Sequence, residues 1–264
     1  MEKCLLGSQL SLNSDGIVAY VSASKALPAV WRRNMMKHSH LTIAAVALAL
    51  LGLVGCGGES PYRNQAFGSR SIPDSVFIIV DTSSSMEEQV MSLSGRLERK
   101  IDIASRSIST LTSQIPRSSA MGLWQYPDPW GYSCNDGLSL VDLSTGANDQ
   151  VINAARGLEA WGDTPTAEAL EAAAASIRNQ SGTTAVILIS DGLSNCGDPC
   201  DVVQRLSSSV DWRITTIGFD LGVSGSSELR CMADASGGSY LNASDGAELE
   251  TIFSDATTLF SVSG

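Results

Sequence analysis

The chain is poor in the side chains that carry out much hydrolytic chemistry and that hold most zinc ions. Its two histidines, His38 and His40, both lie near the front, and residues 57–264 contain none. This absence excludes Ser-His-Asp and Cys-His catalysis from that part, together with any zinc site that uses histidine. The sequence also lacks the glycine-rich phosphate loop that ends in Gly-Lys-Ser or Gly-Lys-Thr.

Positive charge is scarce beyond the front of the chain. The 264 residues include 17 basic and 28 acidic ones. Residues 1–56 hold five of the basic and two of the acidic residues, so residues 57–264 have a net charge of −14, with Lys100 as their only lysine. Such a surface repels phosphate backbones and attracts cations, so we expect no nucleic-acid partner.

The front of the chain contains an apolar run that ends in a cysteine. The run extends from Leu41 to Val54 and follows a short, polar, basic segment. It is short for a membrane span and typical of the core of a signal peptide. Its last letters, LVGC, end at Cys56 and resemble the lipobox of bacterial lipoproteins. The resemblance implies cleavage before Cys56 and a lipid on its sulfur; an ordinary secretory signal with a chance cysteine is the alternative.

These features divide the chain into four predicted parts. We expect residues 1–34 to be a non-native upstream extension, because a signal peptide belongs at the extreme N-terminus. Residues 35–55 are then the lipoprotein signal peptide, and residues 56–73 are the lipidated cysteine with a flexible tether rich in Gly, Ser and Pro. Residues 74–262 form the predicted domain. The expected location is the cell envelope, lipid-anchored on a periplasmic or extracellular face, and the outer membrane in a Gram-negative source.

Apolar strands and helical patterns alternate along residues 74–262. Val76–Val80 and Ala185–Ser190 are continuous apolar runs, typical of strands buried on both faces. Further strands are predicted at Ala120–Asp128, Leu138–Ser144, Arg213–Phe219 and Ser239–Leu241. Helices are predicted at Ile101–Ile115, Asp149–Trp161, Thr164–Arg178, Cys200–Ser207, Ser226–Ala235 and Ala247–Phe260. This alternation predicts a three-layer α/β domain with a mainly parallel sheet.

Polar motifs follow both buried runs. Asp81-x-Ser83-x-Ser85 comes after the first run, and Asp191 ends the second in "VILISD". Between them, "GDTPTAEAL" contains Thr164. The three motifs, in this order, resemble those of the von Willebrand factor type A domain, and the resemblance covers essentially the whole of residues 74–262. It implies a Rossmann-like fold whose mainly parallel sheet has one antiparallel edge strand.

The resemblance also implies a metal-ion-dependent adhesion site. In that site the hydroxyls of Ser83, Ser85 and Thr164 bind the ion, while Asp81 and Asp191 supply charge, largely through bound waters. Mg²⁺ is the expected ion, with Mn²⁺ or Ca²⁺ as alternatives, because hard cations prefer oxygen ligands. Neutral hydroxyls leave the ion electrophilic, so an open coordination position would take an Asp or Glu of a partner protein.

Each motif has an ordinary structural explanation as well. The two serines can cap the helix or turn after the strand, and Thr164 can cap the helix that follows it. The Asp191-Gly192 pair can be a simple turn. Taken together, these explanations require five residues to coincide by chance, so the combination favours a metal site.

Four cysteines of the predicted domain form two candidate disulfides. An even number of cysteines in an exported chain indicates disulfide pairing, and the absence of histidine argues against a zinc site. The expected strand order favours Cys200–Cys231 together with Cys134–Cys196, and a local Cys196–Cys200 bridge is the alternative.

The function predicted from the sequence is non-enzymatic. We expect a metal-dependent protein-binding module on a membrane-anchored lipoprotein, with a partner that is neutral or basic around its contacting carboxylate. One alternative is a Mg²⁺-dependent phosphatase-like Rossmannoid enzyme, although that class has a second aspartate where this chain has Ser83. Another is a structural envelope lipoprotein with an unoccupied site.

Overall fold

A single six-stranded sheet organises the part of the chain that the structure describes. The structure is a computed structural model and describes residues 72–260. The strands lie in the order β5-β4-β1-β6-β7-β8, and all neighbours are parallel except β4 and the edge strand β5. The strand bounds are β1 Ser75–Asp81, β4 Ala120–Tyr126, β5 Leu138–Thr145, β6 Thr184–Ser190, β7 Trp212–Phe219 and β8 Tyr240–Ala243.

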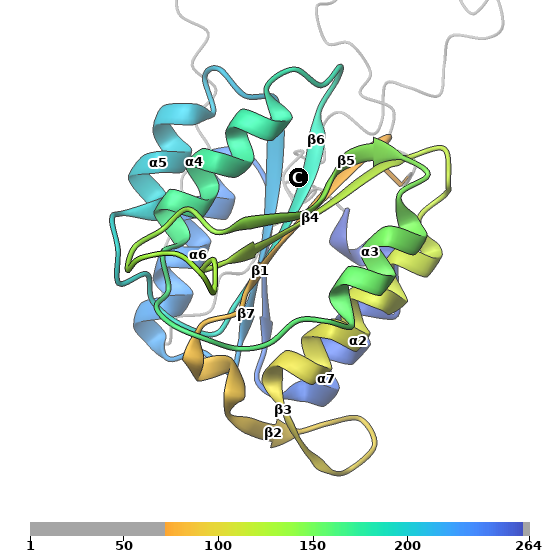
Figure 1. The fold of residues 1–264 in the computed structure, drawn as a ribbon, viewed down its shortest axis with the longest axis vertical. Helices are drawn as coiled ribbons and strands as arrows, with labels where there is room; N and C mark the ends of the chain where they lie inside the picture. Colours follow the sequence, from red (N-terminus) through yellow and green to blue (C-terminus); the bar gives the residue numbers. More distant parts are fainter. Residues whose placement is uncertain (1–71, 261–264) are drawn as a thin grey trace, which may run out of the picture. The chain divides into compact units, whose positions relative to one another are not determined.

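Helices cover both faces of this sheet (Figure 1). One face packs against α2 Lys100–Gln114, α3 Asn148–Ala155, α7 Gly246–Phe253 and α8 Ala256–Leu259. The other face packs against α4 Thr166–Ile177, α5 Pro199–Leu206 and α6 Val223–Ser236. The predicted three-layer, mainly parallel architecture with one antiparallel edge strand is therefore confirmed.

Strand β1 is apolar without interruption because both of its faces are buried. Val76, Ile78 and Val80 point into the core on the α2 side, while Phe77 and Ile79 point into the core on the α4 side. All five side chains are fully buried. A strand with helices on both faces has no solvent side, so alternation of polar and apolar residues disappears.

The register of the central strands brings their polar ends together. β1 pairs with β6 so that Val80 lies opposite Ile189. The residues that come next, Asp81 and Ser190, therefore lie side by side at the same edge of the sheet. Asp191 follows Ser190, so both predicted metal-site aspartates lie at the carboxyl ends of neighbouring strands, where open α/β sheets bind ligands.

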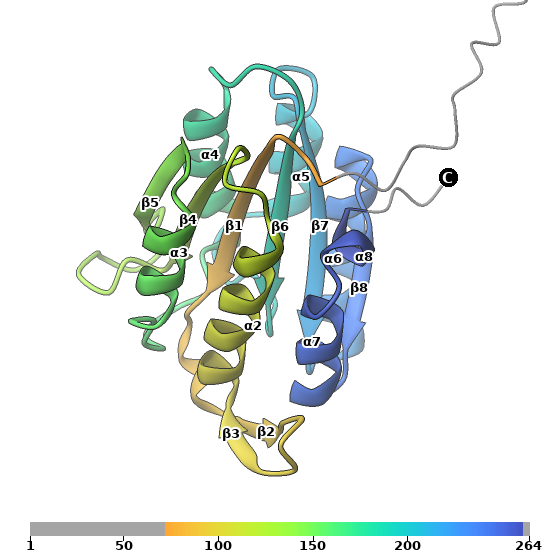
Figure 2. The same ribbon diagram turned by 90° about the vertical axis from the view of Figure 1, so that its right-hand side faces the viewer.

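A small hairpin projects near this edge and was missing from the prediction (Figure 2). The 3₁₀ helix η2 (Ser84–Glu87) leads into β2 (Gln89–Met91), which pairs with β3 (Leu97–Arg99) before α2 begins. The two strands are three residues long, and none of their residues is buried. Strands this short are not long enough to show the hydrophobic alternation by which a strand is recognised in a sequence.

Two helix predictions were too long. The helix predicted at Asp149–Trp161 ends at Ala155, because the following backbone turns back to the carboxyl edge of the sheet, where the Trp161 amide donates to the Thr82 carbonyl at 2.5 Å. The closing helix breaks into α7 and α8, since Asp255 starts a new helix by accepting a hydrogen bond from the Thr257 amide.

The predicted front segments lie almost entirely outside the described residues. This applies to the upstream extension, the signal peptide, Cys56 and the tether as far as residue 71. The last two tether residues contact the domain: Ile72 packs against the core, and the Pro73 carbonyl accepts a hydrogen bond from the Ser119 hydroxyl at 2.9 Å. Within residues 72–260, no helix combines the length and the apolarity that a membrane crossing needs.

Candidate metal centre

Asp81 is held rigidly at the end of β1. Its side chain is fully buried. One carboxylate oxygen, Oδ1, accepts the Ser83 amide at 2.8 Å, and the other, Oδ2, accepts the Ser190 hydroxyl at 2.8 Å. Because both oxygens have a fixed partner, the carboxylate has one orientation, and it turns the chain so that the following serines face the carboxyl edge of β6.

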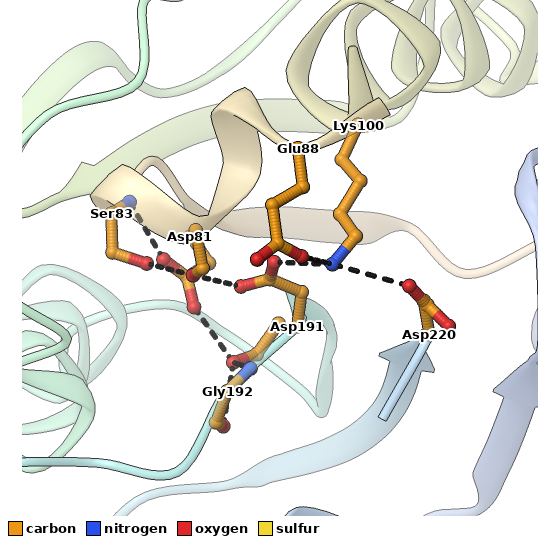
Figure 3. Close-up of polar contacts among 9 residues, drawn as sticks. Asp81, Ser83, Glu88, Lys100, Asp191, Gly192 and Asp220 are labelled. Atoms are coloured by element: carbon orange, nitrogen blue, oxygen red, sulfur yellow. Dashed lines mark hydrogen bonds and ion pairs between the residues drawn. The ribbon is translucent and has the colours of Figure 1, made fainter. Parts of the chain in front are cut away.

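Three side-chain oxygens converge beside Asp81. The hydroxyls of Ser83 and Ser85 are 3.1 Å apart, and the Ser85 hydroxyl donates to Oδ1 of Asp191 at 2.6 Å. In Figure 3, Asp191 lies between the Asp81 turn and Lys100. Two oxygens bound to Mg²⁺ at right angles lie about 3 Å apart, because Mg–O bonds measure about 2.1 Å. The two serine hydroxyls therefore already have the spacing of neighbouring ligands around one octahedral ion.

Thr164 lies at the edge of this cluster. Its hydroxyl oxygen is 3.9 Å from the position that a Cβ on Gly192 would occupy, next to Asp191. Its backbone is fixed by Asn195: the Thr164 amide donates to Asn195 Oδ1 at 3.0 Å, and the Asn195 amide donates to the Thr164 carbonyl at 3.2 Å. Among the described residues, no hydrogen bond joins the Thr164 hydroxyl to Ser83, Ser85 or either aspartate.

The hydroxyls do not serve as helix caps. Ser83 occupies the N-cap position of η2, but its side chain makes no capping hydrogen bond there. Helix α4 begins at Thr166 with Pro165 at its N-cap, so Thr164 lies one residue too early to cap it. The ordinary explanation by capping therefore fails for Ser83 and Thr164, and their hydroxyls stay available for another role.

The donor set fits a hard divalent cation. The candidate ligands are hydroxyl oxygens backed by two carboxylates, and Mg²⁺ binds through few protein ligands and keeps several waters. Within residues 72–260, no three His, Cys, Asp or Glu side chains are grouped so as to hold a metal ion. A centre here would thus depend on its serine and threonine hydroxyls, as the family resemblance implies.

The electrostatics of Asp81 favour a nearby cation. Burial, and then the nearby charge of Asp191, raises the pKa of Asp81 from its ordinary 3.8 to about 7. The hydrogen bonds from Ser83 and Ser190 only partly offset this rise. Two close, buried carboxylates are costly when both are ionised, and a cation between them would lower that cost.

This elevated pKa predicts a pH dependence for the metal-free protein. Between about pH 4 and pH 7, Asp81 is ionised in the unfolded chain but protonated in the folded protein, so rising pH favours the unfolded chain. The contribution of protonated Asp81 to the stability of the folded protein is therefore complete only below pH 4. That contribution is lost as pH rises through about 7. We expect the stability of metal-stripped Asp81→Asn to increase relative to the parent between pH 4 and pH 8, as measured by urea unfolding. A constant difference would contradict the elevated pKa.

Lys100 is a residue beside the candidate centre that the sequence analysis missed. Its side chain is buried at the start of α2, and its Nζ lies 3.0 Å from Asp191 Oδ2 and 2.8 Å from Glu88 Oε2. Burial lowers the pKa of Lys100, but the hydrogen bond to Glu88 and the charge of Asp191 outweigh burial and leave the pKa above 10.5. Lys100 therefore remains an ammonium ion. Its isolation as the only lysine after residue 56 was the one available signal.

The two disulfides adopt the pairing that the sequence favoured. Cys134 is bonded to Cys196, and Cys200 is bonded to Cys231. The first bridge joins the β4–β5 loop to the loop after β6, directly beside Asn195, which holds the Thr164 backbone. The second bridge joins α5 to α6. Only the first bridge is therefore placed to support the candidate centre.

Comparisons with known proteins agree with this fold. The sequence model of the von Willebrand factor type A domain matches residues 75–255. A Bacillus subtilis (strain 168) protein, "Uncharacterized protein YwmD", is 29% identical over 221 residues, which cover 78% of this chain and 93% of that protein.

Two solved structures with the same fold belong to longer chains. A von Willebrand factor type A structure from Catenulispora acidiphila has a TM-score of 0.52 at 21% identity, over 69% of this chain and 41% of that one. The pilus adhesin SpaC from Lactobacillus rhamnosus GG has a TM-score of 0.55 at 16% identity, over 70% of this chain and 30% of that one. This chain spans less than half of either, and at these identities the similarity concerns the fold alone.

Proposed function

The chain belongs to the von Willebrand factor type A family, and from this premise we propose that it is a non-enzymatic, metal-dependent protein-binding module. Its ion, Mg²⁺ or Mn²⁺, would be bound by Ser83, Ser85 and Thr164, with Asp81 and Asp191 behind them. An open position on the ion would take an Asp or Glu carboxylate of a partner protein.

This proposal rests on one observation: the hydroxyls of Ser83 and Ser85 converge with Asp191 at one edge of the sheet. Neutral oxygens neutralise little of the ion's charge, so it would keep a strong attraction for an additional carboxylate. Ser85 and Gly192 are half-buried while Ser83 is buried, so the cluster is reached from outside past Ser85. The net charge of −14 in residues 57–264 favours a partner that is neutral or basic around its contacting carboxylate.

The proposal includes an anchor at the cell envelope. A lipid on Cys56 would hold the domain near a membrane, with no nucleic acid involved. Membrane fractionation tests the anchor: Cys56→Ser should release the full chain into the soluble fraction, and continued membrane association would contradict a lipid at Cys56.

Peptide selection tests the binding function. We expect peptides selected from a random display library on the full chain in millimolar Mg²⁺ to share an Asp or Glu. Replacing that residue by Asn or Gln, or adding EDTA, should abolish binding. The double variant Ser83→Ala/Ser85→Ala should not bind, whereas Ser84→Ala, an exposed residue between the two, should bind like the parent. Selected peptides that bind equally well in EDTA would contradict the function.

A further inference from the structure

A buried lysine lies directly behind the candidate metal centre. The side chain of Lys100 is 2% exposed, and its Nζ contacts three carboxylates: Glu88 at 2.8 Å, Asp191 at 3.0 Å and Asp220 at 3.4 Å. Figure 3 shows the ammonium group between Glu88 and Asp191 on one side and Asp220 on the other. Burying an ammonium ion costs several kcal/mol unless it is well paired, so a chain retains such a residue only where its partners compensate that cost.

The three carboxylates come from separate parts of the fold. Glu88 precedes β2, Asp191 follows β6, and Asp220 follows β7 with a φ of 55°. The backbone of Lys100 is fixed too, because its amide donates to the Glu88 carbonyl at 2.8 Å. Through these contacts, Lys100 links the β2–β3 hairpin and the start of α2 to the carboxyl ends of β6 and β7. Its ammonium group is therefore held in one position.

The two carboxylate oxygens of Asp191 contact different groups, one in the candidate centre and the other on Lys100. Its Oδ1 accepts the Ser85 hydroxyl at 2.6 Å, and its Oδ2 accepts the Lys100 ammonium at 3.0 Å. We propose that Lys100 is a positioning residue that sets the ion selectivity of the centre, by holding Asp191 so that only one of its oxygens faces the ion. This inference rests on the proposed function, since it concerns the same ion.

The selectivity follows from the coordination habits of the two common cations. Ca²⁺ takes six to eight oxygens and often binds both oxygens of a carboxylate, whereas Mg²⁺ requires near-octahedral geometry and keeps its waters. Asp191 cannot turn both oxygens to an ion while Lys100 holds Oδ2. Asp81 is restricted in the same way by Ser83 and Ser190. With neither aspartate able to chelate, the centre favours Mg²⁺ and Mn²⁺ over Ca²⁺.

The positive charge of Lys100 has a second consequence. It draws electron density from Asp191, so this carboxylate neutralises less of the bound ion's charge, which leaves more attraction for a partner's carboxylate. Without the ammonium, Asp191 could turn both of its oxygens toward the ion, an arrangement that suits Ca²⁺ better than Mg²⁺.

Calorimetric titration of the full chain with Mg²⁺, Mn²⁺ and Ca²⁺ tests the role of Lys100. The parent should bind Mg²⁺ more tightly than Ca²⁺. Lys100→Met should lower the ratio of Mg²⁺ to Ca²⁺ affinity by weakening Mg²⁺ binding in particular, since removing a group that orients a metal ligand typically weakens metal binding by about ten- to a hundredfold. Lys100→Arg keeps the charge and should preserve the ratio. Asp220→Asn, which leaves the contact between Lys100 and Asp191 in place, is the matched control and should preserve it as well.

The outcomes separate this inference from the proposed function. An unchanged ratio in a folded Lys100→Met variant, or equal losses for both ions, overturns the role of Lys100 and leaves the metal site intact. A parent that prefers Ca²⁺ overturns it too. A parent that binds none of the three ions overturns the proposed function itself. If circular dichroism shows Lys100→Met to be unfolded, Lys100→Met/Glu88→Gln replaces it, because this variant also removes the charge of a carboxylate that has lost its ammonium partner, and it should show the same fall in the ratio.

Discussion

Saturating Mg²⁺ should raise the unfolding midpoint of the full chain, and the same ion should leave Asp81→Ala unchanged. The candidate ligands come from the end of β1 and the η2 turn that follows it, the loop before α4 and the residue after β6, so only the folded chain brings them together. An ion that binds the folded state alone stabilises it by about 2.7 kcal/mol when its concentration is a hundred times the dissociation constant. Thermal unfolding in EDTA and in Mg²⁺, followed by circular dichroism, measures the shift.

The comparison must be made within each variant. Asp81→Ala leaves the Ser83 amide without its acceptor and removes one of the two acceptors of the Ser190 hydroxyl, so its midpoint in EDTA will already differ from that of the parent. Only the change caused by Mg²⁺ is informative. Ser84→Ala retains all five candidate ligands and should respond like the parent. If the parent and Ser84→Ala show no shift in millimolar Mg²⁺, the cluster does not bind the ion.

Removing the Cys134–Cys196 disulfide should cost both stability and metal affinity. A bridge with a sequence separation of 62 stabilises by about 4 kcal/mol in the chain-entropy estimate. The bridge also fixes the loop in which Asn195 holds both the amide and the carbonyl of Thr164. In Cys134→Ser/Cys196→Ser, we expect a lower free energy of unfolding in urea and weaker Mg²⁺ binding, because Thr164 is no longer held beside Gly192.

The second disulfide provides the matched control. Cys200–Cys231, with a separation of 31, also has an estimated contribution of about 4 kcal/mol, but it joins two helices away from Thr164. Cys200→Ser/Cys231→Ser should therefore lose similar stability and keep the parent's Mg²⁺ affinity. Equal losses of affinity in both double variants would mean that general loosening of the fold, and not the position of Thr164, explains the effect.

Much of the fold was predictable because its strands are apolar for a simple physical reason. The runs Val76–Val80 and Ala185–Ser190 have helices on both sides, so every position is apolar except Ser190 at the end of the second run, and both runs were correctly assigned as buried strands. The placement of Asp81 and Asp191 at the same edge followed from this assignment, since parallel neighbours have their carboxyl ends together. The expected strand order also favoured the disulfide pairing that the structure shows over a local Cys196–Cys200 bridge.

The unpredicted features depend on contacts that are distant in the sequence. In the sequence, Lys100 resembles an ordinary surface residue at the start of a helix. Only the folded arrangement of β6 and β7 brings Asp191 and Asp220 to its ammonium group. Likewise, the segment after Ala155 leaves its helix because the Thr82 carbonyl accepts the Trp161 amide. Neither effect is visible in local periodicity, which reports only whether a face is apolar.

Binding of Mn²⁺ to the full chain, followed by the loss of its free-ion electron paramagnetic resonance signal, tests the central claim most directly. The account predicts one Mn²⁺ bound per chain, displaced by Mg²⁺, retained in Ser84→Ala and lost in Ser83→Ala/Ser85→Ala. Binding that survives loss of both serine hydroxyls, or no binding by the parent at all, would contradict a metal centre at the end of β1.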